Sequence, residues 1–301
     1  MLTQSDFINI EKQATAIYES LELQIIEEIA TRVANVGYAN TVVLNDIQIG
    51  QEMGALYQDI LKLVAEYNNT SYKKVAKIFE QAGAKTLRFD DKIYTEVGLN
   101  PLPINQSPGM VQMLNATIEK TSGNLQNLVM TTATNSQVAF YNAMNMTYME
   151  VSTGTKSYSQ AIIDSISKIA SVGGVITYPS GRNMSIESAT RMNIITGVNQ
   201  TCGKLQELRA NELGWDLMEL TAHSGARPSH ASWQGKIVSL SGQKGYLSKK
   251  DVGYGTATGF KGVNCRHDWY PYYKGSSRTY SEEQLRKWQN MDSWESRYQR
   301  S

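Results

Sequence analysis

The first part of the chain alternates apolar and polar residues with the period of an α-helix. From Ser5 to about Ala34 the apolar residues fall in steps of three and four, at Phe7, Ile10, Ala14, Ile17, Leu21, Ile25, Ile29 and Val33. Residues spaced in this way lie on one face of a helix, and Gly37 is expected to end it. The pattern predicts a long amphipathic helix that buries this face.

A second helical pattern follows, with two expected interruptions. It begins at the capping residue Asn45 and continues through Ile49, Met53, Leu56, Ile60 and Val64. The polar stretch Asn68-Asn-Thr70 is expected to end this helix, and a third, shorter helix is expected to run to Gly83. Helical structure cannot continue through Leu99-Asn-Pro-Leu-Pro103, because each proline lacks a donor and disfavours the helical conformation of the residue before it.

Another helical stretch is expected from Ser107 to about Val151, with a weak point at Thr131-Thr-Ala-Thr-Asn135. It contains the run Met144-Asn-Met-Thr-Tyr-Met149. Methionine side chains are flexible and polarizable, so this run is interpreted as core filling or as a seam between helices. The same adaptable side chains would also suit an assembly interface.

The pattern changes after residue 150. A short helix from Ser157 precedes a turn and strand at Gly173–Tyr178, a tight turn at Pro179–Arg182, and a helix from Ser185 to Glu212 whose Ala189, Met192, Ile195, Val198, Leu205 and Leu208 are spaced for burial. Trp215–Thr221 is expected to be a strand, residues 224–275 to have little helical structure, and a polar helix to begin near Ser281.

These elements predict the α+β class, with a long-helix N-terminal region followed by a compact, loop-rich α+β domain. The expected boundaries are 1–150 for the helical region, 151–280 for the α+β domain and 281–301 for a helical tail. We found no internal repeat and no low-complexity tract.

Composition narrows the class of protein. The chain is 41% hydrophobic and 19% charged, an ordinary soluble composition. No apolar run approaches the roughly 20 residues that cross a bilayer, and the N-terminus lacks the pattern of a secretory signal, so no membrane role and no export are expected. The two cysteines, Cys202 and Cys265, lie in segments of different character, which favours free thiols in a reducing compartment.

Charge is distributed unevenly along the chain. Residues 223–301 contain 13 Lys/Arg and 6 Asp/Glu, whereas residues 1–222 contain 16 and 22. A basic C-terminal part could face double-stranded DNA, whose attraction is mainly electrostatic, or an acidic protein partner. It could equally be an ordinary solvated surface.

Candidate chemistry is concentrated in 45 residues that contain all three histidines of the chain and one cysteine. His223, His230, Cys265 and His267 supply three nitrogen ligands and one sulfur ligand, a set acceptable to zinc. Cys-x-His is not the usual Cys-x-x-Cys spacing, so ligands from separate loops would have to converge.

Two other interpretations of this cluster remain open. In one, the imidazoles and the guanidinium groups of Arg227 and Arg266 hydrogen-bond to loop carbonyls and fix a region with little regular structure, together with the neighbouring Trp233, Gly235 and Asn264. In the other, Cys265 is a nucleophile with a histidine as its base, although no recognisable oxyanion loop precedes it.

The same region carries a joint motif that is far more specific than any of its pieces. The motif consists of His223-Ser-Gly-Ala-Arg-Pro-Ser-His-Ala-Ser-Trp-Gln-Gly235, Gly253-Tyr-Gly255, Gly259-Phe-Lys-Gly-Val-Asn-Cys-Arg-His267 and Tyr270-Pro-Tyr-Tyr-Lys-Gly275. It closely resembles the minor capsid protein 2 family of tailed phages, which looks related to the head-morphogenesis proteins of phage Mu type. Upstream matches extend the likeness over about residues 140–280, at Tyr148, Ala161, Gly174, Tyr178, Gly181, Arg182, Arg191 and Gly197.

The resemblance implies a low-copy structural protein of the phage head. Such a protein is made beside the portal protein, enters the virion with it in the bacterial cytoplasm, and takes part in head assembly and in packaging or delivery of DNA. The expected partners are the portal protein, the major capsid protein, or both, with DNA facing the basic C-terminal part. The resemblance attaches no catalytic role to these positions, and zinc is the one cofactor for which the residues offer ligands.

The main alternative is an enzyme or toxin-like effector that is carried in the head and delivered with the genome. Polar residues at strand ends and in loops favour an ADP-ribosyltransferase or a metal-dependent hydrolase. The lack of a convincing Glu-x-Glu or His-Glu-x-x-His motif counts against both chemistries. A third alternative is an assembly factor that leaves before the particle matures.

Overall fold

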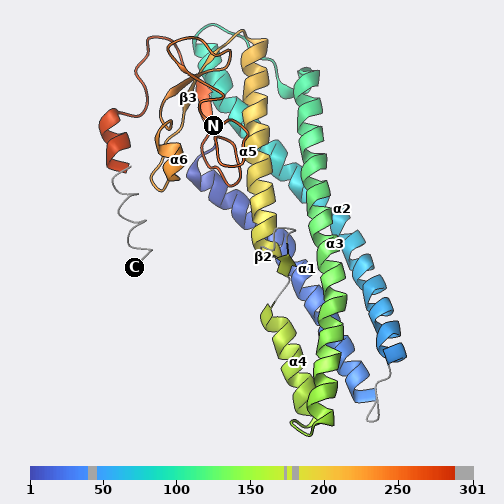
Figure 1. The fold of residues 1–301 in the computed structure, drawn as a ribbon. Helices are drawn as coiled ribbons and strands as arrows, with labels where there is room; N and C mark the ends of the chain where they lie inside the picture. The colour runs from blue at the N-terminus through green and yellow to red at the C-terminus, as the bar shows by residue number, and fades with distance from the viewer. Residues whose placement is uncertain (40–45, 173–174, 178–182, 289–301) are drawn as a thin grey trace. The chain divides into compact units, whose positions relative to one another are not determined.

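The computed structural model describes residues 1–39, 46–172, 175–177 and 183–288 (Figure 1). Its helices are α1 (Gln4–Ala39), α2 (Asp46–Glu96), α3 (Pro108–Ser152), α4 (Tyr158–Val172), α5 (Ile186–Glu212) and α6 (Pro228–Ala231), with a 3-10 turn η1 (Ile104–Gln106). Its strands are β1 (Val175–Thr177), β2 (Asn183–Ser185), β3 (Leu217–Leu220), β4 (Ile237–Ser239), β5 (Leu247–Ser248) and β6 (Trp269–Pro271). The predicted α+β class is confirmed.

Helix α1 buries the predicted amphipathic face. The apolar residues expected on that face are all at most 6% exposed: Phe7, Ile10, Ala14, Ile17, Leu21, Ile25, Ile29 and Val33. The prediction that Gly37 ends the helix is wrong, because α1 continues to Ala39. A glycine costs a helix only about 1 kcal/mol relative to alanine, so it is a weak stop signal.

Helix α2 is continuous where the sequence predicted two helices. The turn expected at Asn68-Asn-Thr70 is helical, because the buried stripe continues across it from Val64 to Val75. Local polar groups are satisfied within the helix as well, since Thr70 Oγ1 donates to Glu66 O at 3.4 Å. Packing therefore overrides the turn propensity of this segment.

Gly83 lies inside α2 and permits close helix packing. A Cβ atom at this position would lie 2.9 Å from Leu205 Cδ1 of α5. The glycine expected to mark a helix end instead allows the two helices to approach each other.

Helix α3 confirms the helix predicted from Ser107 to about Val151. The break predicted at Leu99–Pro103 is also present, because α2 ends at Glu96. The weak point expected at 131–135 is helical. The hydroxyls of Thr131, Thr132 and Thr134 each donate to the carbonyl oxygen four residues earlier, at 2.9, 3.0 and 3.1 Å. Their hydroxyl groups are therefore satisfied by hydrogen bonds within the helix and do not interrupt it.

The chain divides into two compact units that do not follow its sequence order. One unit comprises Met1–Glu11, Ala76–Lys120 and Ile194–Ser301, and the other comprises Lys12–Val75 and Thr121–Asn193. The division therefore differs from the boundaries expected near residues 150 and 280. One reason is that the first residues bind the C-terminal region, where Leu2 N donates to Asp268 Oδ2 at 2.7 Å.

The unit formed by Lys12–Val75 and Thr121–Asn193 is mainly helical. Buried apolar residues of α1, α2, α3 and α4 form its interior, among them Leu21, Ile60, Phe140 and Ile162. The hydroxyl of Thr147 on α3 lies 2.9 Å from that of Ser165 on α4, both buried. Strands β1 and β2 pair antiparallel, with Ile176 opposite Met184.

The other unit contains a mixed four-stranded sheet in the order β5-β4-β3-β6. Strand β3 pairs antiparallel with β4 and β6, and β4 pairs parallel with β5. The strand expected at 215–221 is thus confirmed as β3. The hydrophobic core of this unit includes a cluster of buried residues, namely Met218, Leu220, Trp233, Val238, Val252, Phe260, Cys265 and Trp269.

The predicted helices in the C-terminal half of the chain are also present. The helix expected from Ser185 is confirmed as α5, and the polar tail is helical over residues 282–288. The tight turn expected at Pro179–Arg182 lies outside the described residues. Within the described chain, no helix has the length and apolar character needed to cross a membrane.

Candidate functional site

The pairing of β3 with β6 brings the two histidine-bearing segments together. Leu220 lies opposite Trp269, and beyond this pair Thr221 N donates to Asp268 O at 2.8 Å. The chain leaving β3 therefore runs beside the chain entering β6. Segments more than forty residues apart in sequence become neighbours at this end of the sheet.

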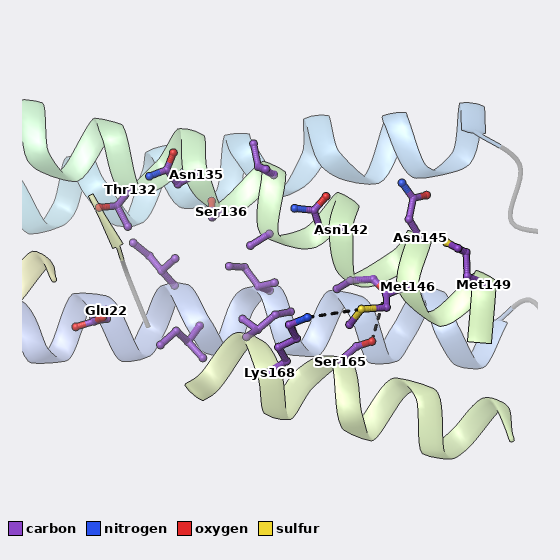
Figure 2. A pocket seen from close by; sticks show the side chains of 17 residues that line it. Glu22, Thr132, Asn135, Ser136, Asn142, Asn145, Met146, Met149, Ser165 and Lys168 are labelled. Carbon is purple, nitrogen blue, oxygen red and sulfur yellow. Dashed lines mark hydrogen bonds between the residues drawn. The ribbon is translucent and has the colours of Figure 1, made fainter. Parts of the chain in front are cut away.

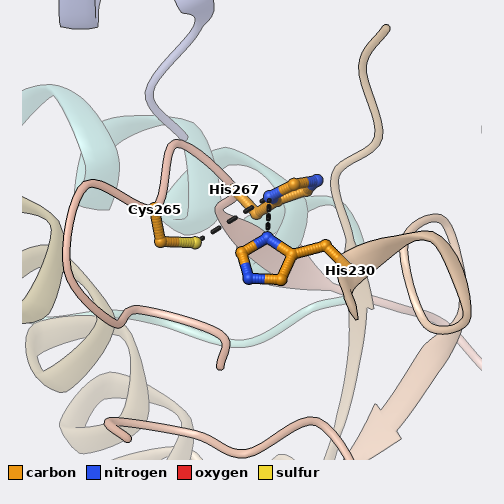
Figure 3. Close-up of side chains that lie close together, drawn as sticks. All are labelled: His230, Cys265 and His267. Atoms are coloured by element: carbon orange, nitrogen blue, oxygen red, sulfur yellow. Dashed lines mark hydrogen bonds between the residues drawn. The ribbon is translucent and has the colours of Figure 1, made fainter. Parts of the chain in front are cut away.

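Three of the predicted side chains converge at this point (Figure 3). His230 comes from α6, whereas Cys265 and His267 come from the loop before β6. The Nδ1 atoms of His230 and His267 lie 3.3 Å apart, and Cys265 Sγ lies 3.8 Å from His267 Nδ1. One ligand atom from each residue lies within 4.8 Å of those of the other two, and all three residues are buried.

The outer ring nitrogens of the two histidines also have defined partners. His230 Nε2 lies 2.9 Å from the carbonyl oxygen of Thr258, and His267 Nε2 lies 3.1 Å from Gln234 Oε1. The same Gln234 oxygen accepts the backbone N–H of His223 at 3.3 Å. These contacts fix the orientation of both rings.

His223, the fourth predicted ligand, occupies a different position. It is not among the three residues whose ligand atoms converge. Its ring stacks on that of His267, with the ring centroids 4.2 Å apart and an angle of 29° between the planes. Trp233 contacts the cluster by its edge, with its centroid 4.9 Å from that of His267.

The other predicted residues fix the surrounding backbone. Arg227 Nη2 donates to Val263 O at 2.6 Å, and Asn264 adopts a left-handed φ of 54°. Arg266 points toward α1, where its Nη2 lies 2.9 Å from Glu11 Oε2. Gly235 has a φ of 69°, and a Cβ there would lie 3.0 Å from Leu285. These residues support the site without contributing a converging ligand.

Burial shifts the pKa values of the three converging side chains. Burial, together with the nearby rings of His223 and His230, holds the pKa of His267 well below its usual value. Burial also lowers the pKa of His230, and it raises the pKa of the Cys265 thiol. This environment disfavours the thiolate form that a cysteine nucleophile requires.

Sequence reasoning missed a buried polar network beside the cluster. Lys261 Nζ lies 2.6 Å from Asp268 Oδ1 and 2.7 Å from Asn199 Oδ1, and all three residues are at most 1% exposed. Gln234, which orients His267, was also missed. Lys261 and Asp268 stand within or directly after the joint motif, but their burial depends on tertiary packing that no periodicity encodes.

Comparison with known proteins gives the family. The family model described as phage minor capsid protein 2 matches residues 2–301. The chain belongs to this family. Among curated proteins it is similar to a structural protein of Lactococcus phage LL-H, with 28% identity over 239 residues. That alignment covers 74% of this chain but 64% of the relative, and no solved structure matches the chain.

This minor capsid protein has a second notable feature, an apolar pocket in its helical unit (Figure 2). The pocket has a volume of about 660 Å³ and is lined by α1, α3 and α4. Its lining includes Ile25 and Ile29 of α1 and Val138 and Met149 of α3. Lys168 Nζ approaches Met146 Sδ at 3.7 Å within it.

The methionine-rich run of α3 divides between core and surface. Met144 is fully buried, which agrees with the core interpretation, whereas Tyr148 and Met149 are 50% and 64% exposed. Val138 and Tyr141, about two to three turns earlier on the same helix, are also exposed. An exposed apolar face of α3 therefore borders the pocket.

The basic C-terminal part is only partly exposed. Lys261 is buried in its ion pair with Asp268, and Arg266 pairs with Glu11. Exposed cationic side chains remain on the surface at Lys236, Lys244, Lys250 and Lys274.

Proposed function

We propose that this structural protein is a low-copy component of the phage head that binds the portal protein through the exposed face of α3. Family membership supports the structural role, and the observation that carries the proposed attachment is the group of exposed residues Val138, Tyr141, Tyr148 and Met149. We define these four residues as the α3 face.

The α3 face has the composition expected of a protein-binding surface. Tyrosine and methionine are enriched at protein interfaces, and tyrosine is frequent among residues that dominate binding energy. Val138 and Met149 also line the apolar pocket, so a partner side chain could be buried there. Exposed apolar surface beside a pocket is more typical of an interaction site than of ordinary solvated surface.

The proposed role is structural rather than catalytic. The three converging residues of the histidine and cysteine cluster, His230, Cys265 and His267, are at most 2% exposed. A buried cluster offers a substrate little access. In this account it stabilises the loop-rich fold while other surfaces make the assembly contacts.

We further propose that the exposed lysines of the C-terminal part lie close to packaged DNA. Lys236, Lys244, Lys250 and Lys274 can attract phosphates regardless of base sequence. Assembly in the bacterial cytoplasm beside the portal protein is consistent with the two free, buried cysteines.

Co-expression with the phage's own portal protein tests the attachment. The wild-type chain is expected to co-elute with portal rings, and Tyr148→Glu is expected to reduce co-elution at least tenfold because a charge would enter the apolar interface. Tyr72→Glu is the matched control, since Tyr72 is a similarly exposed tyrosine of α2 in the same unit, 43% against 50% exposed.

Two outcomes would contradict the proposal. Equal co-elution of the wild type and Tyr148→Glu would show that the α3 face is not the interface. Binding to the major capsid protein alone, tested in a parallel co-expression, would exclude the portal protein as the direct partner.

A further inference from the structure

The hydrogen bonds around the buried histidines determine where their lone pairs point. Gln234 Oε1 accepts the backbone N–H of His223, which identifies this amide atom as the oxygen. Because an oxygen acceptor faces His267 Nε2 at 3.1 Å, that nitrogen carries the hydrogen. The neutral His267 ring therefore presents an unprotonated Nδ1.

His230 carries its hydrogen on the corresponding ring nitrogen. A backbone carbonyl can only accept, and Thr258 O lies 2.9 Å from His230 Nε2. The hydrogen of the neutral ring is therefore on Nε2, and Nδ1 carries a lone pair. Both Nδ1 lone pairs thus belong to the contact in which these atoms are 3.3 Å apart.

Two facing acceptors do not form a hydrogen bond with each other. The thiol of Cys265 can supply one hydrogen, and its sulfur lies 3.8 Å from His267 Nδ1. That single donor cannot satisfy both imidazoles. A cation bound between the three atoms would satisfy all of them at once.

Two of the three distances between these atoms are close to those of tetrahedral zinc, and the ligand atoms of all three residues lie within 4.8 Å of one another. With Zn–N bonds of about 2.0 Å and Zn–S bonds of about 2.3 Å, tetrahedral geometry places two nitrogens roughly 3.3 Å apart and a nitrogen and a sulfur roughly 3.5 Å apart. The corresponding distances here are 3.3 Å and 3.8 Å. Sulfur and imidazole ligands together favour zinc over calcium or magnesium.

The outer contacts also follow the pattern of metal-binding histidines. Such histidines usually donate their second ring N–H to a carbonyl or carboxylate oxygen, which fixes the ring and its protonation. Thr258 O fills this position for His230, and Gln234 Oε1 fills it for His267. Both parts of a metal site are therefore in place.

We propose that His230, Cys265 and His267 bind one Zn²⁺ ion through Nδ1, Sγ and Nδ1. Binding replaces the thiol hydrogen of Cys265, which leaves as a proton. Among the described residues no fourth side chain converges on the ion, so its fourth position is open to a non-protein ligand. The ion joins α6 to the loop before β6 and so stabilises a region whose strands are short. This inference is independent of portal attachment and of DNA contact.

Metal analysis of the purified full-length chain is the first test. Protein prepared under reducing conditions is expected to contain one zinc per chain, and Cys265→Ala and His267→Ala are expected to contain none. Cys202→Ala is the matched control, because Cys202 is an equally buried free thiol outside the cluster and should leave the zinc in place. Zinc retained at full occupancy in folded Cys265→Ala would overturn the assignment.

His223→Ala tests the number of protein ligands. Its ring stacks on His267 but does not belong to the converging set, so the variant is expected to retain one zinc. Complete loss of zinc from a variant that keeps its circular dichroism spectrum would contradict three-residue ligation.

Gln234→Leu tests the outer contact. Gln234 acts by positioning His267 rather than by ligating the metal, so the variant is expected to bind zinc roughly 10- to 100-fold more weakly in competition with a chromophoric chelator. Unchanged affinity would contradict the role of Gln234 in placing the lone pair of His267 on Nδ1.

Cobalt substitution keeps the proposal testable if the ligand variants fail to fold. The wild-type chain with Co²⁺ in place of Zn²⁺ is expected to show a thiolate-to-metal charge-transfer band and the intense visible bands of a four-coordinate ion. A spectrum without the charge-transfer band, or with only the weak bands of a six-coordinate ion, would overturn the proposal.

Discussion

Lys261 and Asp268 form a buried ion pair, with Lys261 Nζ 2.6 Å from Asp268 Oδ1 and the side chains 1% and 0% exposed. Asp268 also accepts the backbone N–H of Leu2 through its second oxygen, at 2.7 Å. One carboxylate therefore connects the start of the chain, the motif loop and β6. This pair is central to the unit that contains the sheet.

Replacing Lys261 alone should destabilise the protein strongly. Lys261→Met leaves the Asp268 charge buried without its partner, and we expect a loss of about 3–5 kcal/mol in the free energy of unfolding, measured with urea. Lys250→Met removes an exposed lysine nearby in sequence and should change stability by less than about 0.5 kcal/mol. A loss below about 1 kcal/mol for Lys261→Met would contradict a buried ion pair.

The double variant Lys261→Met/Asp268→Asn should recover part of this loss. Neither residue of the double variant is charged, so the uncompensated buried charge is removed. An Asn side-chain oxygen can still accept the Leu2 N–H. Urea unfolding of both single variants and the double variant measures the coupling, and strict additivity of the two losses would argue against direct interaction.

Two glycines of the motif are predicted to resist substitution for steric reasons. A Cβ at Gly259 would lie 2.1 Å from Gly253 O, and one at Gly262 would lie 2.2 Å from Thr256 O. We expect Gly259→Ala and Gly262→Ala each to cost more than about 2 kcal/mol or to prevent folding. At Gly123 of helix α3, by contrast, a Cβ would meet nothing within 4 Å. Gly123→Ala should therefore increase the free energy of unfolding by about 0.5–1 kcal/mol, seen as a higher melting temperature.

Asp216 should make a pH-dependent contribution to stability. Burial acts to raise its pKa, but hydrogen bonds from Ser239 and from the backbone and side chain of Ser241 outweigh burial, so its pKa is lowered. A lowered pKa in the folded state means that the contribution is present above the usual pKa of about 3.9 and is lost as pH falls through the folded value.

Comparing Asp216→Asn with the wild type tests this expectation. Near pH 7 the variant should be less stable by about 1 kcal/mol, because the charged acceptor of the 2.6 Å bond from Ser239 Oγ is gone. Below pH 3 the difference should shrink. An unchanged difference across this range would show that the charge of Asp216 does not contribute.

DNA contact through the exposed lysines predicts a salt-dependent affinity. Each lysine that neutralises a phosphate contributes about −0.9 to the slope of log affinity against log salt. Replacing Lys244, Lys250 and Lys274 by Gln should therefore weaken binding to duplex DNA of any sequence and flatten that slope. Binding that is absent at low salt, or insensitive to these changes, would refute DNA contact.

The helical periodicity was a reliable guide to burial but not to helix ends. All eight apolar positions predicted for the first helix are buried, because a stripe with this spacing has one face to hide. The expected stops at Gly37, Asn68-Asn-Thr70 and Gly83 failed, since local propensities of about 1 kcal/mol are smaller than the packing along the same helix. Of the stop signals predicted within the described helices, the proline pair alone separates two helices, α2 and α3.

The candidate site could be predicted in composition but not in arrangement. The clustering of histidines and a cysteine in sequence gave four candidate ligands, of which His230, Cys265 and His267 converge. The sequence could not show that His223 stacks on His267, or that Gln234 orients the His267 ring. Both contacts depend on the pairing of β3 with β6 across nearly fifty residues. The burial of Lys261 likewise had no signal in the pattern of polar residues.

The most direct test of the proposed role is the copy number of this chain in purified, DNA-filled particles. Quantitative mass spectrometry against the portal and major capsid proteins measures it. A small, fixed number of copies per portal ring is the result predicted for a low-copy head component. Absence of the chain from mature particles would contradict that role and leave a protein that acts only during assembly.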